Sequence, residues 1–248
     1  MESTQDLRLA VLIDADNVSS IHVKPMMEEI AKYGRPTFKR IYGDWTSSSL
    51  TGWKKVLLES AITPIQQFGY TSGKNSTDVA MIIDAMDILY TGRVDGFCIV
   101  SSDSDFTRLA VRLKEAGMKI FGMGEKKTPI PFISACDKFI YLEILNPKEI
   151  DEPGSKKQKD KGQNTIGKLD PHTIRLIKES IVDVADDDGW AFLGDLGNLI
   201  LKKRPDFDPR NYGFRKLVPL VKGIPGIEVD ERKTANKNIT HVFVRAKS

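Results

Sequence analysis

Leu9-Ala-Val-Leu-Ile-Asp-Ala-Asp-Asn17 is the stretch that decides the fold of the first half of the chain, and Phe97-Cys-Ile-Val-Ser-Ser-Asp-Ser-Asp-Phe106 is its counterpart further on. Each begins as a short apolar run and ends in closely spaced aspartates. An apolar run of this length without polar alternation is typical of a strand that is buried on both faces of a sheet. Carboxylates that directly follow such strands predict a ligand site at one edge of a parallel sheet.

Short β-rich runs alternate with helical patterns up to about residue 145. Strands are expected at 9–13, 37–42, 63–68, 97–100 and 119–121, and helices around 24–33, 50–60, 76–90 and 105–116. Ser76 is expected to cap the third of these helices and Gly92 to end it. The alternation predicts an α/β domain, with a mostly parallel sheet flanked by helices on both faces.

A polar, lysine-rich stretch at 149–167 interrupts this pattern and predicts a flexible charged linker. After the linker, helices are expected at 170–185, 193–204 and 208–223, followed by strands at 227–229 and 240–244. Three helices followed by a hairpin is the order of a small winged helix-turn-helix domain. The expected domains are therefore 1–148 and 168–248, joined by the linker.

Composition limits the function classes. The chain has 248 residues with a net charge of +3, and it contains no apolar run of the ~20 residues that a membrane span requires. The start lacks the order of a secretory signal, and the two cysteines, Cys98 and Cys136, are too few for a disulfide framework. A soluble, cytoplasmic protein is expected. Residues 1–150 hold 18 Lys/Arg and 19 Asp/Glu, whereas residues 165–248 hold 15 and 12, which suits an acidic centre beside a module that touches phosphates.

The aspartates carry the expected chemistry. Because parallel strands end at one sheet edge, Asp14, Asp103 and Asp105 can point into one crevice, and Asp78 can enter it from the start of a helix. Carboxylates so close repel one another unless a cation lies among them, and hard oxygen ligands favour Mg²⁺ or Mn²⁺. Such ions activate water for phosphodiester hydrolysis. The sequence shows no arrangement that suggests a nucleophilic serine or histidine.

Each of these residues also has a purely structural interpretation. Asp103 can cap the helix that follows it, and Asp78 in a first helical turn is favourable to the helix dipole. Asp84 and Asp87 fit solvated helix positions. Asn17 can orient the loop or a metal-bound water, or merely close an Asx turn.

Three ordered motifs make residues 7–145 resemble the NYN domain, in particular its LabA-like branch. They are Ile13-Asp-Ala-Asp-Asn17, Lys74-Asn-Ser-Thr-Asp78 and Val100-Ser-Ser-Asp-Ser-Asp-Phe106. NYN domains belong with the PIN-like nucleases, which cleave RNA with divalent metal. The resemblance implies catalytic and metal-binding roles for Asp14, Asp78, Asp103 and Asp105, and supporting roles for Asp16, Asn17, Lys74 and Asp84. Ser102 departs from the family, which commonly has glycine at that position.

The C-terminal segment resembles a LOTUS (OST-HTH) domain through Trp190-Ala-Phe-Leu-Gly-Asp-Leu-Gly197 and the stretch 203–217. Members of that family bind RNA or, in some proteins, partner proteins. The candidate phosphate contacts are Lys202, Lys203, Arg204, Arg210, Arg215 and Lys216. The aromatic residues of the stretch, among them Phe207 and Tyr212, are expected in the core rather than under RNA bases.

The leading hypothesis is a metal-dependent ribonuclease with a tethered RNA-binding domain. Asp14-Ala-Asp16 also fits the opening of haloacid-dehalogenase-type phosphatases, in which the first aspartate attacks phosphorus. That alternative leaves Asp78 without a role, and Asn17-Val18 departs from that family's pattern. A second alternative is a non-catalytic RNA-binding or adaptor protein on a relict nuclease fold.

Overall fold

The computed structural model describes residues 6–68, 76–145, 169–233 and 240–247. The chain divides into two compact units, Met1–Glu152 and Pro153–Ser248. The predicted linker at 149–167 lies outside the described residues, so the domain boundaries expected from the sequence stay a prediction. None of the helices in the described ranges has the length and apolar composition needed to cross a bilayer.

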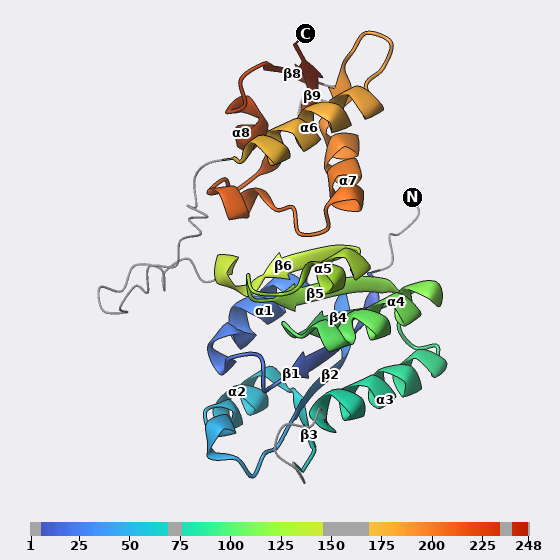
Figure 1. Cartoon of the computed structure of the whole chain (residues 1–248), viewed down its shortest axis with the longest axis vertical. Helices are drawn as coiled ribbons and strands as arrows, with labels where there is room; N and C mark the ends of the chain where they lie inside the picture. Colours follow the sequence, from blue (N-terminus) through green and yellow to red (C-terminus); the bar gives the residue numbers. More distant parts are fainter. Residues whose placement is uncertain (1–5, 69–75, 146–168, 234–239, 248) are drawn as a thin grey trace, which may run out of the picture. The chain divides into compact units, whose positions relative to one another are not determined.

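The first unit is built on one six-stranded sheet, shown edge-on in Figure 1. Its strands are β1 (Arg8–Asp14), β2 (Arg35–Gly43), β3 (Thr63–Gln66), β4 (Gly96–Val100), β5 (Lys119–Gly124) and β6 (Lys138–Tyr141). They are ordered β3-β2-β1-β4-β5-β6, and every neighbouring pair is parallel. The predicted α/β architecture with a parallel sheet is therefore confirmed.

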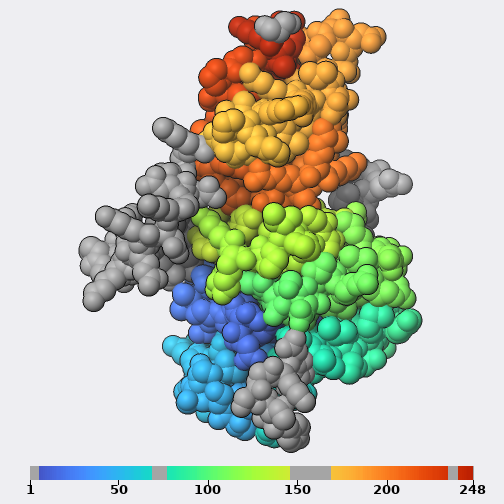
Figure 2. All heavy atoms as spheres, in the orientation of Figure 1, coloured from blue at the N-terminus to red at the C-terminus, as the bar shows by residue number. Residues whose placement is uncertain are grey.

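Helices cover both faces of this sheet. They are α1 (Val23–Ile30), α2 (Trp53–Ser60), α3 (Ser76–Tyr90), α4 (Thr107–Glu115) and α5 (Ile130–Ala135). Successive residues of β1 alternate between the two faces, so Ala10 and Leu12 pack with α3, α4 and α5, while Val11 and Ile13 pack with α1 and α2. Figure 2 shows α3 and α4 next to one another on the surface of the unit. The double burial explains why the strand sequences are continuously apolar.

The strand order places a topological switch point between β1 and β4. From β1 the chain adds β2 and β3 on one side, and then crosses over to add β4, β5 and β6 on the other. Ile13 of β1 is in register with Val100 of β4, so both strands end at the same level. A crevice forms where connections leave in opposite directions from two neighbouring parallel strands. The two aspartate-rich stretches follow these two strands.

The second unit combines helices with a small antiparallel sheet. Its elements are α6 (Pro171–Val184), β7 (Ala191–Phe192), α7 (Leu193–Lys203), α8 (Leu217–Lys222), β8 (Ile227–Lys233) and β9 (Thr240–Ala246). The sheet has the order β7-β9-β8. Its inner face contributes Val244 to a core with Ile177, Leu196 and Leu220. The predicted order of helices followed by a hairpin is present.

Three elements were not expected from the sequence, and one expectation was wrong. β6, α5 and β7 have four, six and two residues, and such short segments show too little of a strand or helix pattern to be recognised. The single helix expected at 208–223 is two pieces, a 3-10 turn at Pro209–Tyr212 and α8. Gly213 separates them, because its φ of 81° is a left-handed conformation that a helix cannot contain.

Candidate metal centre

Asp14 ends β1 as a buried carboxylate that accepts hydrogen bonds on both of its oxygens. The Asn17 amide donates to Oδ2 over 2.6 Å, and the Ser101 hydroxyl donates to the same oxygen over 2.8 Å. The backbone N–H of Asp16 donates to Oδ1 over 3.0 Å. Burial raises the pKa of Asp14 and these donors oppose the rise. The site thus begins with a carboxylate whose position is fixed by its neighbours.

Ser101 connects the end of β1 to the end of β4. While its hydroxyl donates to Asp14, its oxygen accepts the backbone N–H of Asp103 over 3.1 Å. Asp103 in turn caps the turn that leads into α4, because its Oδ1 accepts the backbone N–H of Asp105 over 2.8 Å. Asp103 therefore has the capping role expected from the sequence, and the capping hydrogen bond also fixes the direction of its side chain.

Asp78 completes the cluster from the first turn of α3. One carboxylate oxygen from each of Asp78, Asp103 and Asp105 lies within 4.8 Å of the other two. Partial burial, followed by the negative charges of Asp14, Asp103 and the other aspartates nearby, raises the pKa of Asp78 to about 6. The end of β1, the start of α3 and the turn after β4 therefore bring together the four principal residues expected from the sequence.

The donor set fits a hard divalent cation. Three carboxylates are gathered with a fourth beside them, and all of the ligand atoms are oxygens, as Mg²⁺ and Mn²⁺ prefer. Partial burial is the larger cause of the raised pKa of Asp78, and the negative charges of the neighbouring aspartates add to it. A bound cation would offset the repulsion among the carboxylates and lower the pKa of Asp78.

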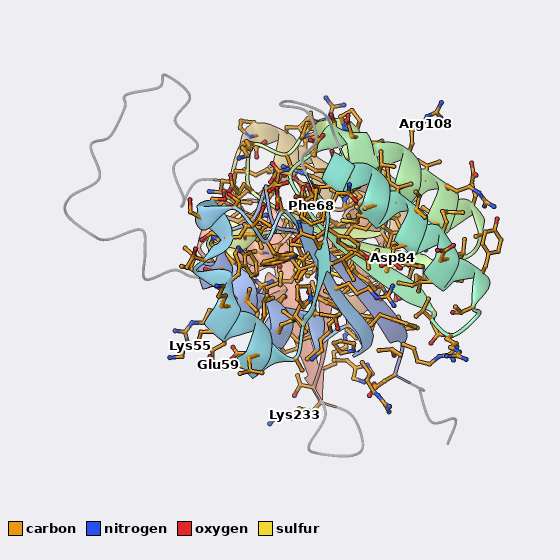
Figure 3. The ribbon with its side chains drawn as sticks, turned by 90° about the horizontal axis from the view of Figure 1, so that it is seen from below. Lys55, Glu59, Phe68, Asp84, Arg108 and Lys233 are labelled. Atoms are coloured by element: carbon orange, nitrogen blue, oxygen red, sulfur yellow. The ribbon has the colours of Figure 1, made fainter. Side chains whose placement is uncertain are left out.

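The other site residues expected in this unit are not part of the carboxylate cluster. Asp84 is part of a separate half-buried network, in which its carboxylate accepts hydrogen bonds from Arg40 and from the hydroxyl of Tyr42. Figure 3 labels Asp84 between α3 and the strands. Asp16 is exposed and touches Asp14 through its backbone. Lys74 lies outside the described residues.

The Arg40–Tyr42–Asp84 network and Ser101 were missed by the sequence analysis. Both contacts join residues that are far apart in the chain, more than forty positions for Asp84 and 87 for Ser101. The position of Ser101 directly after an apolar strand was the available signal. We propose that Asp84 supports the centre indirectly by holding α3, and with it Asp78, against β2.

Three of the six basic residues expected to contact RNA in the second unit have internal partners. Lys203 donates to Asp183 over 2.5 Å, Arg204 to Thr173 over 2.7 Å, and Arg210 to the buried Asp208 over 2.7 Å. The others, Lys202, Arg215 and Lys216, are exposed. Phe207 and Tyr212 belong to the hydrophobic core and its margin, as expected.

A cavity of about 810 Å³ lies along α2 and the loop that follows β2. Trp45, Lys54 and several hydroxyl side chains line it, but none of the clustered aspartates does. It is therefore distinct from the carboxylate centre.

Comparison with known families and proteins agrees with this organisation. The family model of the NYN domain matches residues 8–143, and that of the OST-HTH/LOTUS domain matches residues 165–239. An uncharacterized protein of Methanocaldococcus jannaschii is 26% identical over 121 residues, which are 47% of this chain and 47% of that protein. The chain therefore spans about half the length of this curated relative.

Solved structures give further similarities. A protein of unknown function from Vibrio parahaemolyticus is 19% identical, with a TM-score of 0.49, and the match covers 57% of this chain and 96% of that one. An uncharacterized protein from Nitrosomonas europaea is 30% identical, with a TM-score of 0.30, over 39% of this chain and 92% of that one.

Asp78→Asn and Asp84→Asn are expected to change stability in opposite directions. Because the folded pKa of Asp78 lies above its usual 3.8, the metal-free protein loses stability as pH rises from about 4 through 6. Removing that charge should stabilise metal-free protein at pH 7.5 by about 1 kcal/mol, allowing for solvent screening. Asp84→Asn breaks an ion pair and should destabilise it by about 2 kcal/mol.

Thermal unfolding in EDTA and in Mg²⁺ at pH 4 and pH 7.5 measures both effects. The stabilisation by Asp78→Asn should shrink at pH 4, and Mg²⁺ should stabilise the wild type and Asp84→Asn more than Asp78→Asn. An Asp78→Asn variant that is destabilised in EDTA at pH 7.5 would contradict the repulsion inferred for this cluster.

Ser101→Ala tests the hydroxyl that joins the two strand ends. In this variant Asp14 loses a hydrogen-bond donor and the Asp103 N–H loses its acceptor. The affinity for Mn²⁺ should therefore fall about 10-fold, the effect expected when a residue that orients metal ligands is removed. Ser104→Ala is the matched control, because Ser104 is exposed in the same loop. Titration calorimetry with Mn²⁺ gives the comparison; equal affinities for the two variants would exclude the positioning role.

Proposed function

The chain belongs to the NYN domain family, and on that premise we propose that it is a divalent-metal-dependent ribonuclease that hydrolyses phosphodiester bonds within an RNA chain. The NYN domain gives it a nuclease fold of the PIN-like type, and the OST-HTH/LOTUS match adds an RNA-associated module. The observation that carries the proposal is the convergence of the Asp78, Asp103 and Asp105 oxygens at the switch point of the sheet. The endonucleolytic activity itself is our proposal.

In this proposal Asp78, Asp103 and Asp105 hold Mg²⁺ or Mn²⁺, and Asp14 stands beside them as the fourth carboxylate. Such an ion provides an activated water and positive charge for the displacement at phosphorus. Ser101 and Asn17 keep Asp14 in one orientation, and the cap to Asp105 keeps Asp103 in one orientation. Pre-positioned ligands need no rearrangement when the substrate arrives.

The second unit would keep RNA close to the centre. Its exposed cations Lys202, Arg215 and Lys216 remain candidate phosphate contacts, whereas Lys203, Arg204 and Arg210 are engaged within the unit. Binding of a partner protein through this unit is the alternative that the family allows. A cytoplasmic location stays a prediction from the sequence.

Asp103→Asn is the sharpest test of cleavage. Asparagine caps a helix as well as aspartate does, so the cap to Asp105 is retained while the charged metal ligand is lost. Cleavage of labelled RNA in Mg²⁺ or Mn²⁺ should fall by about 100-fold or more, since even residues that only support metal ligands contribute 10–100-fold. Affinity for RNA should change little. The assay follows product formation on a panel of RNAs and single-stranded DNAs, with EDTA as the metal-free arm.

Asp87→Asn is the matched control, because Asp87 is an exposed carboxylate of α3 and its loss should leave cleavage unchanged. Metal-dependent cleavage that survives Asp103→Asn would contradict the assigned centre. Wild type that binds RNA but cuts none of the panel would favour the adaptor alternative. A phosphoenzyme on Asp14 would instead identify the phosphatase alternative, since a metal-activated water leaves no covalent intermediate.

A further inference from the structure

The outward face of the small sheet in the second unit carries aromatic and arginine side chains. Phe243 of β9 is paired with Phe192 of β7 on one side and with Asp230 of β8 on the other. Side chains alternate between the two faces of a strand, so residues two positions from Phe243 on β9, and two positions from its partners on β7 and β8, share this face. Val244 points into the core on the other face. The residues that form this aromatic–arginine face are Trp190, Phe192, Arg232, His241, Phe243 and Arg245.

The rings and guanidinium groups of this face lie close to one another. The Arg232 guanidinium lies 4.2 Å from the centre of the Phe243 ring and 5.4 Å from that of Trp190. The Arg245 guanidinium lies 4.7 Å from the centre of the Trp190 ring. These distances are within the range of cation–π contacts. The face therefore presents an alternation of planar groups rather than a continuous apolar surface.

Phe192 extends this cluster of rings to the edge of the sheet. Its ring centre lies 5.7 Å from that of Phe243 and 5.4 Å from that of His241, and the residue is 37% exposed. An exposed phenylalanine in a cluster of aromatic groups is a feature that burial in the unit's own core does not explain. The core of the unit is formed on the opposite face of the sheet.

Acidic residues on the same face hold the arginines in place. Arg232 donates to Asp230 over 2.8 Å, and Arg245 donates to Glu228 over 2.6 Å. These ion pairs hold the guanidinium groups beside the rings. Lys233 and Lys247 are exposed at the ends of β8 and β9, where Lys247 also pairs with Glu228 over 3.1 Å, and Figure 3 shows Lys233 at the tip of its strand.

We infer that the aromatic–arginine face binds an unpaired segment of RNA by stacking its bases on Phe192, Phe243 and the two guanidinium planes. Unpaired bases stack on aromatic rings and on arginine, whereas the bases of a duplex are already stacked. Lys247, which is exposed on this face and pairs with Glu228 over 3.1 Å, is the candidate contact to the phosphates of the same segment. The inference takes RNA as the ligand class from the proposed function. It assigns the stacking of bases to the sheet rather than to the cations between 202 and 216.

Chemistry favours RNA over a protein as the occupant of this face. Aromatic rings and arginine also occur at the centres of protein interfaces, so a protein is kept as an outcome of the test and RNA is chosen on the match between exposed rings and neighbouring cations. Here each guanidinium lies among rings, and lysines stand at the strand ends. Alternating rings and cations match the alternating bases and phosphates of a single strand.

The test measures binding of the full chain to a labelled single-stranded RNA in EDTA, so that the RNA is not cut. Phe192→Leu with Phe243→Leu should weaken binding by about 10-fold or more, and Phe192→Leu alone by about 5-fold, because stacked bases are lost. Arg232→Lys, which keeps the charge but not the plane, should also weaken it. The same variants should bind an abasic oligonucleotide of equal length as well as the wild type does.

Tyr90→Leu and Arg175→Lys are the matched controls, because Tyr90 is an exposed ring of the first unit and Arg175 an exposed arginine on α6. Unchanged thermal unfolding of each variant shows that the fold is retained. Equal affinity of wild type and stacking variants for the unpaired RNA would overturn the inference. It would also be overturned if the variants lost as much affinity for the abasic oligonucleotide as for the RNA. If metal-dependent cleavage persists while the stacking variants bind normally, only this inference fails and the proposed function stands.

Discussion

Electrostatic repulsion among four aspartates, gathered from the ends of β1 and β4 and the start of α3, is the constraint on which the rest of the structure depends. Like charges gathered in one crevice oppose folding, and together with partial burial, the larger cause, they raise the pKa of Asp78 to about 6. The fold holds the carboxylates together through contacts outside the cluster. β1 is fully buried between two cores, and Ser101 and the cap at Asp103 fix the two strand ends. The arrangement is therefore strained toward binding a cation.

Much of the fold could be predicted from the sequence, because its main strands and helices have strong periodic signals. The helix at 76–90 is long enough to be read from its period alone, and the apolar run at 9–13 can be assigned as a buried strand because it is short, continuous and followed by polar residues. β6, α5 and β7 were missed because they have six residues or fewer and owe their structure to neighbouring elements. The broken helix at Gly213 was missed because a positive φ follows from the local turn rather than from a hydrophobic period.

The candidate centre was predictable in its residues but not in its supporting contacts. The motif spacing placed Asp14, Asp103 and Asp105 after neighbouring strands, and parallel topology alone brings such residues together. By contrast, the partners of Asp84 come from β2, and no local pattern connects Arg40 and Tyr42 with a helix that follows much later. Electrostatic partners over such separations depend on the completed packing. The same reason explains why Lys203 and Arg204 looked like surface cations in the sequence, whereas Arg210 pairs with Asp208 only two residues away.

Diffraction from crystals grown with Mn²⁺, using the anomalous signal of the metal, tests the central claim most directly. The account predicts an anomalous peak at coordination distance from oxygens of Asp78, Asp103 and Asp105, with Asp14 nearby and its bonds to Ser101 and Asn17 intact. A fully formed carboxylate cluster without a peak at saturating Mn²⁺, or a peak bound by other residues, would contradict it.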